Sequence, residues 1–242
     1  MVLGILGGMG PAATADVYSK IIAAQAPLSD QEGMSVIVYA DPNVPDRSAA
    51  LLDMGPSPVT ALRRGAMALS AMGATHLVIA CNTAHAFLED DGTLGGAHVV
   101  DMTTSAVEEC VANTEVGEMV AVLGTAGLGR SALYERALNS YGRSLLEIGP
   151  EVQELVTRLI YGVKASMDVQ LLKRMWDQVE SHLESQGIEC AILACTELPL
   201  IAREAVRGIR LIDPAETVAH AVRILFEDGT NSKSAMTLSA RL

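Results

Sequence analysis

The chain has 242 residues, which is room for one large domain or two small ones at roughly 100–200 residues per domain. Half of the residues are hydrophobic, which excludes wholesale disorder, while aromatic residues make up only 3%, too few for a platform that stacks nucleic-acid bases or sugars. The formal net charge of -12 disfavours nucleic acids and anionic membrane surfaces as partners.

The sequence predicts a cytoplasmic protein without a metal. No apolar run reaches the ~18 residues of a membrane span, and no basic residue precedes Lys20, so the positive region of a secretory signal is missing. The four cysteines include no CxxC pair and the five histidines no HExxH motif, so neither a disulfide framework nor a zinc site is expected.

In chain order, short β-branched runs alternate with longer helical patterns. The predicted strands are Val2–Leu6, Ser35–Ala40, His76–Ala80, His98–Val100, Met119–Leu123, Ala191–Ala194 and Ile209–Ile212. The predicted helices are Pro11–Ala24, Pro58–Met72, Ser105–Ala112, Ser131–Tyr141, Val152–Val163, Asp168–Gln186 and Ala215–Phe226. Near-continuous apolar strands between helices indicate an α/β fold with parallel strands covered on both faces. The polar tail from Asp228 to Leu242 is expected to fray.

An internal repeat predicts two similar α/β halves. Three pieces recur in the same order at offsets of 117, 114 and 112 residues: 3–7 with 120–124, 73–83 with 187–197, and 99–101 with 211–213. We expect two parallel-sheet domains related by a pseudo-twofold axis, with the active site in the cleft between them. The first domain would comprise 1–101 plus 213–242, and the second 102–212. The alternative is one long doubly wound sheet with similar strand endings.

The repeat places Cys81 and Cys195 at equivalent strand ends. Ligands of open α/β sheets bind outside the carboxyl ends of the strands, so two facing ends would put one thiol on each side of a small ligand. Such a pair suits inversion of a stereocentre, since one group removes a proton from one face and the other donates a proton to the opposite face. The alternative for any cysteine is that it serves as a small hydrophobe, and we apply it to Cys110 and Cys190.

The first turn allows two interpretations. Gly8-Met9-Gly10-Pro11-Ala12-Ala13 matches G-x-G-x-x-A between a strand and a helix, as in dinucleotide-binding folds. However, Asp41 lies 31 residues after Gly10, where about 20 is usual. The same backbone, with Met9 at its centre, could instead receive a substrate carboxylate.

Polar and basic side chains near these strand ends suit an acidic substrate. Short hydroxyl and amide side chains lie beside the thiols or after the repeated strand: Asn82, Thr83, Thr125 and Thr196. Arg47, expected in an extended loop, and Lys164, at the end of a helical segment, could pair with carboxylates. Their alternative interpretation is solvated surface charge.

The motifs GILGGMGPAAT at 4–14, NVPDR at 43–47, ACNTAH at 80–85 and ACTELP at 194–199 together resemble the aspartate/glutamate racemase superfamily, most closely its aspartate racemases. The resemblance implies cofactor-independent racemisation with Cys81 and Cys195 as acid and base, and a homodimer. It implies that Asn82, Thr83 and Thr196 hold the α-carboxylate and amino group, and that Arg47 and Lys164 hold the side-chain carboxylate. Glu197 is a natural neighbour of Cys195. The chain departs from its relatives at Leu128, where they often carry a second threonine, so a more apolar pocket wall is expected there.

The leading hypothesis is therefore an acidic amino-acid racemase, with aspartate ahead of glutamate. Two alternatives stay open at this point. One is another reaction of the same superfamily, such as maleate isomerisation or hydantoin racemisation. The other is an NAD-dependent dehydrogenase or nucleotide-binding module that uses the Gly8-Met9-Gly10 turn.

Overall fold

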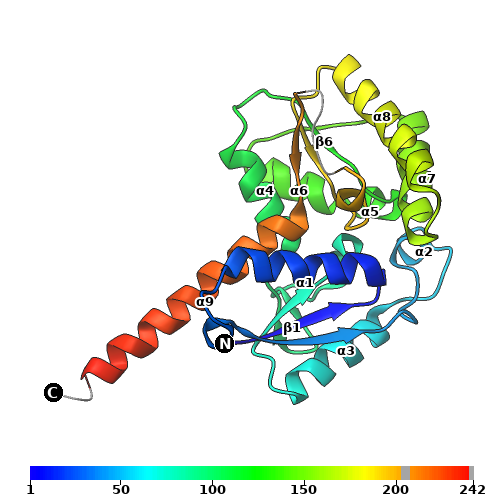
Figure 1. The fold of residues 1–242 in the computed structure, drawn as a ribbon. Coiled ribbons are helices and arrows are strands. Elements are labelled where there is room, and N and C mark those ends of the chain that lie inside the picture. Colours follow the sequence, from blue (N-terminus) through cyan, green and yellow to red (C-terminus); the bar gives the residue numbers. More distant parts are fainter. Residues whose placement is uncertain (203–207, 240–242) are drawn as a thin grey trace.

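Two parallel sheets form the body of the protein (Figure 1). The computed structural model describes residues 1–202 and 208–239, the stretch 229–239 as backbone only. The first sheet has the order β2-β1-β3, where β1 is Val2–Gly7, β2 is Ser35–Ala40 and β3 is His76–Ile79. A parallel bridge between Leu77 and Val99 extends it beyond β3.

The second sheet repeats this order. It runs β7-β6-β8-β9, with β6 at Val120–Val122, β7 at Leu145–Leu146, β8 at Cys190–Ile192 and β9 at Arg210–Ile212. In the repeat, β6 corresponds to β1, β8 to β3, and β9 to the segment bridged at Val99. We call the part built on β1–β3 the first half and the part built on β6–β9 the second half. The expected α/β fold with two similar parallel sheets is confirmed.

Helices cover both faces of the first sheet because apolar side chains alternate along β1. Leu3 and Ile5 pack against α1 (Pro11–Gln25) and α9 (Pro214–Ser239). Leu6 packs on the opposite face against α3 (Val59–Ala71). The second sheet is covered in the same way, by α7 (Pro150–Lys164) and α8 (Val169–Ser185) on one face, and by α4 (Met102–Ala112) and α6 (Leu133–Ser140) on the other.

The two halves exchange a helix. The helix α4 follows the first sheet but packs on the second, and α9 follows the second sheet but returns to the first (Figure 1). Each begins after an equivalent aspartate: Asp101 accepts bonds from two backbone N–H groups of α4, and Asp213 accepts one from Ala215 of α9. The return of the last helix agrees with the expected organisation, while the exact domain boundaries at 101 and 213 stay a prediction.

Several element predictions were wrong in detail. Arg47 does not lie in an extended loop, since it begins the short helix α2 (Arg47–Leu51). The predicted helix Ser131–Tyr141 is preceded by α5 (Ala126–Ser131) and starts after a break at Ala132, where the backbone φ is 52°. The last helix continues to Ser239 instead of ending at Phe226, and the end of the tail, 240–242, lies outside the described residues.

The stretch around His98 is also shorter than predicted. In place of a strand His98–Val100, a small antiparallel hairpin pairs β4 (Thr93–Leu94) with β5 (Ala97–His98), and only Val99 bridges to the first sheet. Gly95 and Gly96 form its turn with positive φ angles, as two-residue hairpin turns require.

Candidate active site

Both repeated cysteines lie just beyond the carboxyl end of a central strand. Cys81 follows β3 and Cys195 follows β8, and each is succeeded by a short 3₁₀-helical turn, at Asn82–Phe87 and Leu198–Leu200. The strands therefore deliver both thiols to the same edge of their sheets, where ligands of such folds bind. By contrast, Cys110 and Cys190 contribute to a fully buried core cluster of the second half.

One small cavity between the halves brings together every residue predicted for the site. Its lining contains Met9, Arg47, Cys81, Asn82, Thr83, Thr125, Lys164, Cys195, Thr196 and Glu197. It is small: the centre of a water molecule can occupy about 10 Å³, close to the space that one water needs. An amino acid therefore requires the halves or their loops to move apart before it can enter.

Cys195 is held as a thiol. Its Sγ donates a 3.0 Å hydrogen bond to Oε2 of Glu197, which is only 2% exposed. Burial raises the pKa of Cys195 well above its ordinary value, and the charge of Glu197 raises this pKa further, outweighing the opposite effect of Lys164. The neutral thiol is therefore the resting form, and Cys195 carries a proton that it could donate.

Lys164 supplies a cation at the cavity wall. Its Nζ lies 3.8 Å from Oε1 of Glu197 and 3.4 Å from the carbonyl oxygen of Met9. Burial lowers the pKa of Lys164, but the nearby negative charge of Glu197 is the largest of the effects that raise it, and the pKa is raised overall. Lys164 therefore stays charged in the cavity and bridges the two halves.

Arg47 is buried instead of lying on the surface. Its guanidinium donates to the carbonyl oxygens of Val44, Pro45 and Met9, at 3.2, 3.1 and 2.8 Å. Arginine has five N–H groups, so two of them remain after these three bonds. One of the two is the Nε–H, which is buried and has no hydrogen-bond partner in the described part of the chain. Arg47 thus anchors the loop before α2 and keeps donors for a ligand.

Hydroxyl and amide groups from both halves also line the cavity. Thr83 and Thr125 approach with 3.3 Å between their Oγ1 atoms, and Tyr134 of α6 donates a 2.5 Å bond to Oδ1 of Asn82. The backbone N–H of Gly127 donates to Oγ of Ser48 at 2.8 Å. These contacts join the two halves beside the cavity.

Sequence reasoning missed three residues of the lining: Asp46, Ser48 and Tyr161. Asp46 and Ser48 flank Arg47, and the side chain of Asp46 caps α2 by accepting from the N–H of Ala49. Tyr161 lies three residues before Lys164 in α7, a spacing that places both side chains on one helix face. The prediction of Lys164 as a site residue could therefore have identified Tyr161 as well. Its hydroxyl donates to Oδ2 of Asp46 across the cleft.

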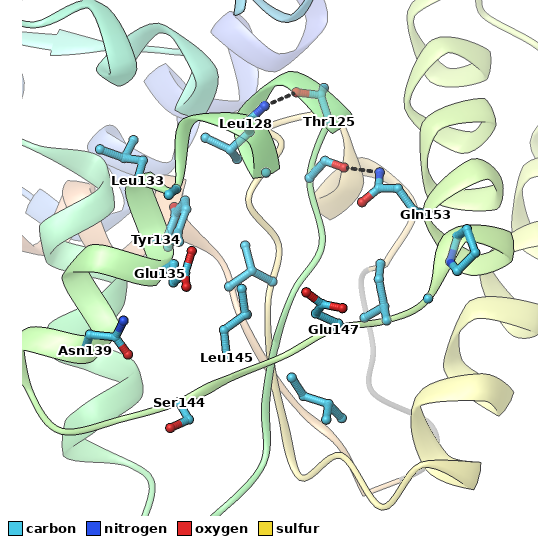
Figure 2. A pocket seen from close by; sticks show the side chains of 18 residues that line it. Thr125, Leu128, Leu133, Tyr134, Glu135, Asn139, Ser144, Leu145, Glu147 and Gln153 are labelled. Atoms are coloured by element: carbon cyan, nitrogen blue, oxygen red, sulfur yellow. Dashed lines mark hydrogen bonds between the residues drawn. The ribbon is translucent and has the colours of Figure 1, made fainter. Parts of the chain in front are cut away.

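Two larger cavities adjoin the site. One, of about 550 Å³, opens beside the Gly8–Ala12 turn and shares Met9, Arg47, Lys164 and Glu197 with the small cavity, so it forms an entrance. The other, of about 590 Å³, lies in the second half beside α5 and α6 (Figure 2). Leu128 lines this second cavity and does not line the small one, so the expected apolar wall at Leu128 was wrong.

The first turn does not favour a dinucleotide. A Cβ atom added at Gly10 would lie 3.0 Å from Oε1 of Glu197, so a carboxylate occupies the space above the turn where a pyrophosphate would need to lie. Asp41, the candidate ribose partner, forms an ion pair with Arg64 at 3.0 Å. The turn instead presents the Met9 carbonyl to Arg47 and Lys164.

Within the described residues, no cluster of three or more histidine, cysteine, aspartate or glutamate side chains could hold a metal ion. In that same part of the chain, no helix is both long and apolar enough to cross a membrane.

Comparison with known proteins agrees with this arrangement. Residues 6–222 match the model of the Asp/Glu/Hydantoin racemase family, and the chain belongs to this family. It is 25% identical over 223 residues to the broad specificity amino-acid racemase RacX of Bacillus subtilis, covering 90% of this chain and 94% of that protein.

Solved structures show the same fold. The aspartate racemase of Picrophilus torridus superposes with a TM-score of 0.80 at 28% identity, with 91% of each chain covered. The glutamate racemase isoform RacE1 of Bacillus anthracis superposes with a TM-score of 0.69 at 20% identity, with 95% of this chain and 82% of that chain covered. These relatives are amino-acid racemases, which are isomerases, and none of these matches favours the dinucleotide alternative.

Proposed function

We propose that this protein racemises an acidic amino acid, aspartate before glutamate, by a two-base mechanism without a cofactor. The observation that carries the proposal is that Cys81 and Cys195, from equivalent strand ends of the two halves, line one small cavity together with two cationic side chains, Arg47 and Lys164. A thiol on each side of the cavity is what proton exchange on both faces of a carbon requires.

In this mechanism the resting Cys195 thiol is the acid and Cys81 is the base. Cys81 takes the proton from Cα of the substrate, and Cys195 gives its proton to the opposite face of the resulting planar carbanion. The reverse reaction starts with the protons exchanged, so the roles of the two cysteines alternate. Glu197 holds the Cys195 proton in the 3.0 Å bond until the carbanion forms.

The cations select the substrate. A second carboxylate that enters a closed cavity must be paired, because burying an unpaired charge is costly. Arg47 keeps two N–H groups for it, and Lys164 adds a charge from the other half. Asn82, Thr83, Thr125 and Thr196 then remain for the α-carboxylate and the amino group, with the N–H groups of the turn at Met9 nearby.

The test is exchange of the α-hydrogen of aspartate in deuterated water, followed by NMR, with dialysed protein and EDTA present. We expect exchange in both enantiomers without added pyridoxal phosphate or metal. Cys81→Ala and Cys195→Ala should each lower racemisation by about 10²–10⁴-fold, while the matched variants Cys110→Ala and Cys190→Ala retain it.

An activity that returns only with a cofactor, or near-normal turnover in the Cys81 variant, would contradict the mechanism.

Glutamate, alanine, a hydantoin and maleate should be tested as substrates beside aspartate. Conversion of the hydantoin alone or of maleate alone would identify another reaction of the family. We also propose that the protein is cytoplasmic, as the sequence predicts, and that it is a homodimer, as the resemblance implies. Sedimentation of the purified protein tests the homodimer.

A further inference from the structure

In the side-chain amide of Asn82, the oxygen has a hydrogen-bond partner and the nitrogen has none among the described residues. Asn82 is only 1% exposed and lines the small cavity. Its Oδ1 accepts the bond from Tyr134, whereas its Nδ2 is buried and has no hydrogen-bond partner among the described residues. A buried N–H donor without a partner is costly, and this cost is removed if a bound ligand offers an acceptor oxygen.

Tyr134 determines which end of the amide is open. Its hydroxyl lies 2.5 Å from Oδ1 of Asn82, a separation typical of O–H···O bonds and shorter than that of N–H···O bonds. Burial raises the pKa of Tyr134 well above its ordinary value, so the hydroxyl stays protonated and acts as the donor. A flipped amide would have to donate an N–H to the Tyr134 oxygen across this 2.5 Å, which is too short for an N–H···O bond, and it would present its oxygen to the cavity.

Tyr134 reaches Asn82 from the other half of the molecule. It lies in α6, is 3% exposed, and stands in the wall of the larger neighbouring cavity (Figure 2). It does not line the small cavity itself, so it can act on a substrate only through Asn82. The bond also joins the halves, so the amide is oriented only when the cleft is closed.

We propose that Tyr134 is a positioning residue, which turns the Asn82 amide so that its N–H groups face a carboxylate oxygen of the bound amino acid. This inference rests on the proposed function. It assigns to a residue outside the cavity a role in substrate affinity, with no part in proton transfer.

The test is a double-mutant cycle measured with aspartate. Tyr134→Phe removes one hydroxyl and should raise KM about fivefold or more while kcat stays within about twofold, because the lost contact is made equally in substrate and transition state. In an Asn82→Ala background, Tyr134→Phe should have no further effect on KM. The matched control is Tyr141→Phe, whose exposed hydroxyl bonds Glu108 at 3.2 Å and which should leave KM unchanged.

A purely structural tyrosine would lower the melting temperature and add its effect on KM to that of Asn82→Ala, and this result overturns the inference. If the wild type racemises no amino acid, the proposed function fails, and a structure of the wild type with bound succinate still decides the role of Tyr134. The same structure is the test in case the Tyr134→Phe variant does not fold. In that structure, Nδ2 of Asn82 should contact a succinate carboxylate while the Tyr134 hydroxyl donates to Oδ1. Contact of succinate with Oδ1 of Asn82, or no contact with Asn82, overturns the inference.

Discussion

Glu197 adds to the effect of burial in keeping Cys195 protonated, which makes the pH dependence of catalysis a test of their contact. In Glu197→Gln the negative charge 3.0 Å from Sγ is removed. Because that charge raises the pKa of Cys195, the pKa should fall toward its ordinary value. The limb of the pH–rate profile that reports Cys195 should therefore move to lower pH, in profiles of kcat/KM measured separately for the two enantiomers.

The matched control is Glu147→Gln, since Glu147 lines the neighbouring cavity and not the catalytic one. It should leave both profiles unchanged. A Cys195 limb that moves to higher pH in Glu197→Gln, or one that does not move, would show that Glu197 does not govern this thiol.

Lys164 provides the residue-scale test of substrate choice. In Lys164→Met the ratio of kcat/KM for aspartate to that for alanine should fall at least about tenfold, or about 1.4 kcal/mol. This is less than the ~2–5 kcal/mol of a fully buried charged contact, because the Lys164 side chain is 25% exposed. The ratio matters because Lys164 also lowers the pKa of Cys195, an effect common to both substrates. Lys173→Met, on the exposed face of α8, is the control. Equal losses for both substrates would remove Lys164 from side-chain recognition.

At the scale of elements, the short helix α2 is what places Arg47. Asp46 caps this helix through its bond to the N–H of Ala49. Asp46→Ala should lower the free energy of unfolding by about 0.5–2 kcal/mol and raise KM for aspartate several-fold, because Arg47 loses its fixed position. Urea unfolding and steady-state kinetics measure the two effects.

Asp46→Asn separates the cap from the charge. Asparagine caps helices about as well as aspartate, so this variant should keep nearly all of the stability. It also replaces Oδ2 of Asp46, which accepts from the Tyr161 hydroxyl, by an N–H donor. If Asp46→Asn destabilises the protein as much as Asp46→Ala, the charge of Asp46 matters more than its cap.

At the scale of the whole molecule, activity depends on how closely the two halves approach. The halves pack closely between α5 and α2, where a Cβ atom on Gly127 would lie 2.5 Å from Cα of Ser48. Gly127→Ala should hold the halves apart, and a displacement of about 1 Å at the reacting atoms can cost about 10²-fold in rate. The kcat for aspartate measures this loss.

Gly129→Ala is the control within the same helix. Nothing lies within 4 Å of a Cβ atom added there, so the variant should keep its activity, and the helix should gain slightly in stability. A Gly127→Ala variant with normal kcat would mean that the closed contact is not needed for catalysis.

The sequence by itself determined the features of this protein that depend on residues close together in the chain. Apolar runs with helical segments between them predict the α/β fold, and the repeat predicts two sheets of like strand order. The cysteines at 81 and 195 come directly after repeated strands, so parallel pairing alone brings each to a carboxyl edge. The ten predicted site residues therefore all line one cavity, since each lies beside a strand end or at a helix end.

Only the tertiary structure decided the features that depend on contacts between the halves. Tyr134 carries no local signal for a role, because its partner Asn82 is 52 residues away in the sequence. The spacing of Tyr161 from Lys164 indicates its helix face, but its partner Asp46 is 115 residues away and could not be predicted. Leu128 turned toward the neighbouring cavity for the same reason, since the packing of α5 against α2 settles where its side chain points. Sequence periodicity predicts which face of an element is buried, whereas the element that packs against this face is determined only by the tertiary structure.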